Sequence, residues 1–179
     1  MSYTIFTKII SQKNYNTSVI FKHFGRDAST VNIYEFMASL VIGGYASYIN
    51  KLKLLFLMFN FNGTGKLSFE EVFIGYKSLI YGYNRLIGKK FPDLKYIESN
   101  AKFIFRKCDI DPDGALEFEE LVEYVDSHSD ASRLMKKFES PKRMDDDYRV
   151  FLAFKRMNDQ EVKFVMQEAL NTNKKRVLE

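Results

Sequence analysis

The stretch Asp109-Ile-Asp-Pro-Asp-Gly-Ala-Leu-Glu-Phe-Glu-Glu120 decides how the rest of the chain is interpreted. Aspartates hold its first, third and fifth places, a glycine its sixth and a glutamate its twelfth. Carboxylates crowded into so short a segment repel one another, and a bound cation is one direct way to relieve that repulsion. The glycine permits a sharp bend, because it tolerates positive φ. The spacing predicts a loop that turns around a hard cation with oxygen ligands.

Calcium is the cation that suits this loop, since it takes roughly six to eight oxygen ligands at flexible geometry. The stretch matches the EF-hand calcium loop at all of that motif's diagnostic positions. The expected ligands are the backbone carbonyl of Ala115 and the side chains of Asp109, Asp111, Asp113, Glu117 and Glu120. Glu120 would close the shell with both oxygens, and Glu117 would act directly or through a water. An acidic, solvated turn followed by a helix is the alternative interpretation.

A second loop, residues 60–71, has the same frame with poorer ligands. It reads Asn-Phe-Asn-Gly-Thr-Gly-Lys-Leu-Ser-Phe-Glu-Glu, with a glycine and a closing glutamate in the corresponding places. Its candidate ligands are the backbone carbonyl of Lys66 and the side chains of Asn60, Asn62, Thr64 and Glu71. Calcium affinity depends on the number of charged ligands, and only Glu71 is charged. We expect weak binding or, as the favoured interpretation, an empty loop that pairs with 109–120 through a short β-bridge of Leu67 and Leu116.

A third and fainter unit is predicted at residues 24–35, with Glu35 in the closing place. Phe24 precedes Asn60 by 36 residues, which is one helix-loop-helix repeat. Phe24, Arg26 and Ala28 would hold the ligand places, and these side chains cannot form a calcium cage. The segment is therefore predicted to be a vestigial hand, although a plain helix-turn-helix explains it almost as well.

A family resemblance is carried by the run Lys51–Phe56, the frame of loop 60–71 and the 49 residues from Asn60 to Asp109. These features resemble the last two hands of neuronal-calcium-sensor-type proteins, and calaxin-like calcium-binding proteins are similar in the same spacings. The resemblance covers roughly residues 20–126. It implies a calcium sensor with a protein partner, dynein or another axonemal component, in a cilium or flagellum. The chain departs from the family in the lost aspartates of loop 60–71 and in having no glycine at residue 2 for myristoylation.

The expected fold is all-α, in three parts. Residues 1–48 hold N-terminal helices with the vestigial hand, residues 49–128 the pair of hands, and residues 129–179 a C-terminal helical tail. Helices are expected at 3–24, 33–42, 46–59, 69–81, 94–108 and 117–127, with 82–92 as a connecting loop rich in breakers. A basic helix at 148–171, with Phe and Met on one face, would fill the groove of its own lobe, dock on a partner or serve as an ordinary core helix.

Composition and residue counts argue against several function classes. The single cysteine, Cys108, allows no disulfide within the chain and favours a reducing, cytoplasmic setting. His23 and His128 are the only histidines, so neither a zinc site nor nucleophilic catalysis is indicated. No phosphate-binding glycine loop and no apolar run of about 20 residues occurs, which argues against an enzyme of that class and against a membrane anchor.

Charge distribution separates the calcium loop from the rest of the chain. The net charge is +4, yet residues 109–130 hold nine acidic residues and no lysine or arginine. The lysines elsewhere recur at helical intervals, as solvated helix faces do, so nucleic-acid binding is not expected. Two functions remain: a calcium-responsive regulatory or adaptor subunit that binds one Ca²⁺, or a structural component of a larger assembly, such as an axoneme, that calcium merely stabilises.

Overall fold

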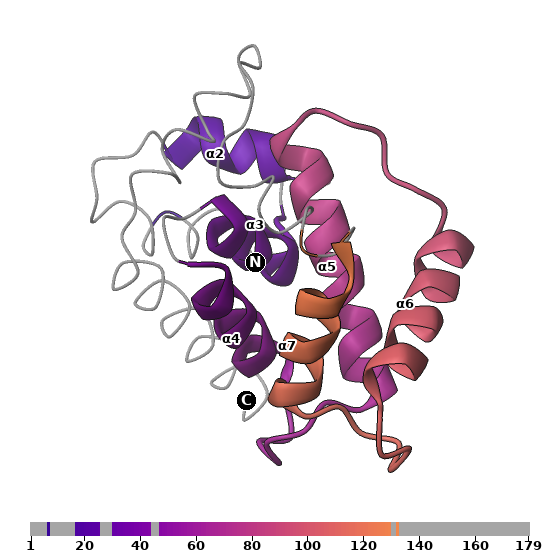
Figure 1. Ribbon diagram of the computed structural model, residues 1–179. Helices are drawn as coiled ribbons and strands as arrows, with labels where there is room; N and C mark the ends of the chain where they lie inside the picture. Colours follow the sequence, from indigo (N-terminus) through magenta and orange to yellow (C-terminus); the bar gives the residue numbers. More distant parts are fainter. Residues whose placement is uncertain (1–6, 8–16, 26–29, 44–46, 130–131, 133–179) are drawn as a thin grey trace.

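The computed structural model describes residues 7, 17–25, 30–43, 47–129 and 132. Six α-helices make up this part of the chain, and its only β-structure is two isolated bridges (Figure 1). The helices are α2 (Thr17–Phe24), α3 (Ile33–Gly43), α4 (Tyr48–Phe59), α5 (Phe69–Leu86), α6 (Leu94–Cys108) and α7 (Phe118–Ser127). The predicted all-α class is confirmed. The predicted helix at 148–171 and the rest of the C-terminal tail lie outside the described residues.

The helix starts follow the polar residues that precede them. Ser68 caps α5: its hydroxyl accepts the amide N–H of Glu71, and the Glu71 carboxylate accepts the amide N–H of Ser68 at 2.9 Å. Asp93 caps α6 by accepting the amide N–H of Lys95. These caps fix where α5 and α6 begin, and so where the loops before them end. None of the described helices combines the length and apolar character that a bilayer crossing requires.

Helix α3 is the centre of the fold. Every residue from 35 to 43 is buried, because this helix is apolar on nearly all sides. It lies among α2, α4 and α5 (Figure 1). Phe36, Met37 and Leu40 have no exposed surface and belong to the same core cluster as the residues that flank the two long loops. The loops are thus held on one continuous core.

The structure corrects the predicted end of the helix that begins at residue 69, which contains Gly82. The sequence places the end of this helix at residue 81, yet α5 continues to Leu86. A Cβ on Gly82 would lie 2.4 Å from the carbonyl oxygen of Glu35 and 2.5 Å from Oγ of Ser39. Glycine is therefore needed here for the close approach of α3 and α5, and it does not break the helix.

Two helix-loop-helix units, α4 to α5 and α6 to α7, meet through their loops. Leu67 and Leu116 form an isolated antiparallel bridge, with both N···O distances at 2.8 Å. Both leucines are buried, at 5% and 1% exposure. The predicted bridge is confirmed. It fixes the register of the two loops, which lie together at the lower end of the molecule in Figure 1.

The segment around residues 24–35 also joins two helices, but its β-bridge lies within the segment and does not pair it with another loop. Gly25 pairs with Val31 inside the segment. Glu35, predicted to close a vestigial calcium loop, is buried and forms an ion pair with Arg85 of α5 at 3.0 Å. The carboxylate of Glu35 thus ties α3 to α5.

Candidate metal centre

The loop between α6 and α7 carries the acidic residues of the candidate site. Asp109 is the C-terminal cap of α6, and Glu120 lies in the first turn of α7. Gly114 turns the chain between them with a φ of 81°, a conformation that glycine adopts without strain. A helix end, a turn and a helix start therefore bring residues from 109 to 120 around one point.

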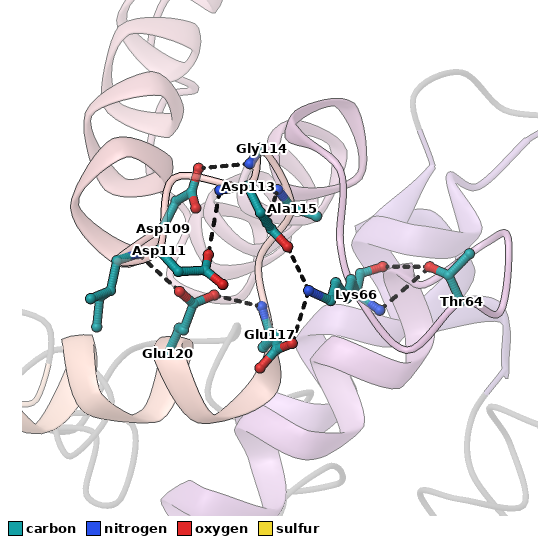
Figure 2. Close-up of polar contacts among 10 residues, drawn as sticks. Thr64, Lys66, Asp109, Asp111, Asp113, Gly114, Ala115, Glu117 and Glu120 are labelled. Carbon is teal, nitrogen blue, oxygen red and sulfur yellow. Dashed lines mark hydrogen bonds and ion pairs between the residues drawn. The ribbon is translucent and has the colours of Figure 1, made fainter.

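Three carboxylates converge in this loop. Side-chain oxygens of Asp109, Asp111 and Glu120 all lie within 4.8 Å of one another (Figure 2). Oδ1 of Asp109 is buried and has no hydrogen-bond partner among the described residues. A buried acceptor without a donor is costly, and a cation would satisfy it. The donor set consists of hard oxygens, which fits Ca²⁺ and Mg²⁺ better than softer metals.

Backbone amides orient the aspartates. Asp109 Oδ2 accepts the N–H of Gly114 at 3.2 Å, Asp111 Oδ1 that of Asp113 at 3.4 Å, and Asp113 Oδ1 that of Ala115 at 2.8 Å. Each of these carboxylates uses one oxygen to hold the turn. The other oxygen of Asp113 contacts Lys66, and that of Asp109 has no hydrogen-bond partner among the described residues.

Glu120 is fixed at two points. One of its oxygens accepts the N–H of Ile110 and the other that of Glu117, both at 2.9 Å. Each carboxylate oxygen can accept more than one hydrogen bond or cation contact, so Glu120 remains available as a ligand. The neighbouring Cys108 is buried, and burial raises the pKa of its thiol to about 12, with the charge of Glu120 adding to the shift. The thiol is therefore held in its protonated form at neutral pH.

Asp113 and Glu117 face a lysine of the other loop. Lys66 Nζ lies 2.5 Å from Asp113 Oδ2 and 2.9 Å from Glu117 Oε1 (Figure 2). Hydrogen bonding to these carboxylates raises the pKa of Lys66, and the same bond lowers the pKa of Asp113. Of the five predicted carboxylate ligands, three converge and two contact Lys66.

Loop 60–71 has a similar backbone with neutral side chains that bond to one another. Asn62 Oδ1 accepts the N–H of Thr64 at 2.9 Å, and the Thr64 hydroxyl lies 2.7 Å from the same atom and 3.1 Å from the carbonyl oxygen of Lys66. Glu71 accepts the amides of Phe61, Asn62 and Ser68. Asn60 Oδ1 is buried and has no hydrogen-bond partner among the described residues, and the same holds for Asp109 Oδ1 at the equivalent place.

Sequence reasoning considered Lys66 only for its backbone carbonyl and missed its side chain. The antiparallel bridge between Leu67 and Leu116 places Lys66 opposite Glu117. The register of the leucines was therefore the signal that could have found this contact.

The chain matches no family model, and no solved structure matches it. The class of protein rests on its own architecture: an all-helical domain, in its described part, with two loop-bridged helix-loop-helix units and one acidic loop.

Proposed function

We propose that the chain is a calcium-binding EF-hand protein that binds one Ca²⁺ in loop 109–120. The observation that carries this proposal is the convergence of Asp109, Asp111 and Glu120, together with the buried Oδ1 of Asp109, which has no hydrogen-bond partner in the part of the chain that the structure describes. Asp113, Glu117 and the carbonyl of Ala115 would complete the shell. Calcium would supply two positive charges to a loop in which five carboxylates are predicted ligands. Affinity in the sensor range, ~10⁻⁷–10⁻⁵ M, is expected for such a ligand set.

Loop 60–71 would serve as the structural partner of this site. Its one carboxylate among the predicted ligands, Glu71, accepts backbone amides of the loop, and the side chains of Asn62 and Thr64 bond to each other. Too little negative charge is left for tight calcium binding. Its role in the pair is to hold loop 109–120 through the leucine bridge.

A calcium-responsive regulatory or adaptor role follows from the place of Glu120. This residue belongs both to the ligand set and to the first turn of α7. Helix α7 packs through Phe118 against Phe56 of α4, with ring centroids 5.6 Å apart, and through the buried Val125. A change in the position of Glu120 would therefore reach the contact between α7 and α4.

An apolar cavity of about 120 Å³ supports a protein partner. Its lining includes Leu55 and Phe59 of α4, Val72 and Leu79 of α5, and Leu121 of α7. Movement of α7 would widen or close this cavity, as in calcium-sensing lobes that bind an amphipathic helix. The resemblance to calaxin-like proteins makes dynein or another axonemal component the partner to test first, in a cytoplasmic or ciliary setting.

The second candidate is a structural component of a larger assembly, in which calcium only stabilises the fold. One observation favours it: just one of the two bridged loops carries aspartates. A regulatory protein would change its amide exchange in α7 and around the cavity when calcium is added, and a structural component would not.

Isothermal calorimetry of the full chain tests the site. We expect one calcium per chain and a loss of affinity of about 100-fold or more in Glu120→Gln, because a charged bidentate ligand is removed. Glu119→Gln is the matched control, since Glu119 is exposed on the same helix turn and lies outside the ligand set. An affinity of Glu120→Gln equal to that of the wild type would contradict the site assignment.

A further inference from the structure

Lys66 occupies an unusual place between the two bridged loops. The bridge register sets it opposite Glu117, and its Nζ also reaches Asp113. The lysine belongs to loop 60–71, whereas both carboxylates belong to loop 109–120. Its side chain is 38% exposed and those of Asp113 and Glu117 are 35% and 46% exposed, so the contact lies at the surface. Water can therefore replace either partner without unfolding the loops.

The contact uses the oxygen that Asp113 would offer to an ion. Oδ1 of Asp113 accepts the amide of Ala115, and Oδ2 contacts Lys66. One oxygen of Asp109 likewise accepts a backbone amide, but its other oxygen has no hydrogen-bond partner within the described ranges. The same ammonium group also forms an ion pair with Oε1 of Glu117. Asp113 and Glu117 thus contact Lys66 and are not among the three carboxylates that converge.

We propose that Lys66 is an internal competitor of calcium, which holds Asp113 and Glu117 in the ion-free protein and must release them when the ion binds. The inference rests on the proposed calcium site and identifies a residue that lowers the affinity of that site for calcium. The lysine relieves repulsion among five carboxylates before binding, which stabilises the ion-free loop. After binding, its charge lies close to the ion and opposes it. Both effects weaken calcium binding.

Replacement of Lys66 tests the competition. In calorimetry of the full chain, Lys66→Met is expected to bind calcium about three- to tenfold more tightly than the wild type, the range that two exposed ion pairs allow. Lys66→Arg keeps the charge and should lie much closer to the wild type. Lys95→Met is the matched control: it removes the same charge from an exposed place at the start of α6, and a change of less than about twofold is expected.

A second measurement needs no substitution. A carbodiimide joins a lysine amine to a carboxylate in direct contact, with loss of water. In the ion-free wild type we expect a cross-link from Lys66 to Asp113 or Glu117, detected by mass spectrometry of peptides. Saturating calcium should suppress this cross-link, while the helix pair Lys102 and Glu98, at 2.6 Å, should react equally in both conditions.

The outcomes separate the two ideas. Unchanged or weaker binding by Lys66→Met, or a cross-link that persists in saturating calcium, would overturn the role of Lys66 while leaving the site intact. Binding by Lys66→Met alone would support the competition in its strongest form. Absence of binding by both proteins would overturn the proposed function together with this inference.

Discussion

Loops 60–71 and 109–120 share one backbone frame and carry different chemistry. Each turns at a glycine of positive φ, 84° at Gly65 and 81° at Gly114. Each contributes a leucine to the bridge and ends in a glutamate that accepts amides of its own loop. Loop 109–120 adds carboxylates that converge, whereas loop 60–71 adds neutral groups that bond to one another. The comparison teaches that the glycine, the bridge and the closing glutamate determine the backbone conformation of the loop. The number of carboxylates then determines whether the loop can bind a cation.

The largest effect is expected where the two loops share a structure. Leu67→Ala and Leu116→Ala should each lower the free energy of unfolding by about 2–5 kcal/mol, because both leucines are buried in one core. The loss of unfolding free energy in the double variant should differ from the sum of the two single losses, since the side chains share neighbours. Urea unfolding of the ion-free protein measures this. Leu57→Ala is the control, as Leu57 is 58% exposed. A similar loss of unfolding free energy in this variant would show that the two bridge leucines contribute no more to stability than an exposed leucine.

Exchanging the charged and neutral side chains of the two loops tests whether their backbones are equivalent. We expect the triple variant Asn60→Asp, Asn62→Asp, Thr64→Asp to raise the calcium stoichiometry from one to two, because it supplies the missing carboxylates. The reverse triple variant, with Asn at 109, 111 and 113, should abolish binding at the natural site. Calorimetry of both proteins decides the point. A stoichiometry that stays at one in the first variant would mean that the loops differ in more than charge.

The two closing glutamates should respond differently to the same change. Glu71→Gln is expected to cost about 1–3 kcal/mol of stability, since one acceptor oxygen of a buried group becomes a donor that faces backbone amides. Its calcium stoichiometry should stay at one. Thermal and urea unfolding, with calorimetry on the same samples, measure both quantities. Glu70→Gln, at an exposed neighbouring residue, is the control. Loss of calcium binding in Glu71→Gln would assign an ion to loop 60–71.

The smallest effect is expected at the glycines. Gly65→Ala and Gly114→Ala should each cost about 1 kcal/mol, because both have positive φ and a Cβ there meets nothing within 4 Å. Only Gly114→Ala should also weaken calcium binding. Equal stability of either variant and the wild type in urea unfolding would show that the loop can turn without glycine.

Local signals predicted most of the helices. The helix expected at 94–108 has those bounds, and the helices expected at 33–42 and 46–59 differ by one or two residues. Caps and apolar spacing act within a few residues, so the sequence expresses them directly. The rule that glycine breaks helices failed at Gly82, because the close carbonyl of Glu35 lies on another helix.

The sequence by itself determined the helical class, the pairing of Leu67 with Leu116 and the acidic residues of loop 109–120, because each depends on spacing along one chain. Only the tertiary structure decided how those acidic residues divide. Asp109, Asp111 and Glu120 converge since a helix end and a helix start meet at the turn. Asp113 and Glu117 contact Lys66 since the bridge sets two distant loops in register. The side chain that each carboxylate meets depends on how the packed loops orient it, which no local pattern specifies.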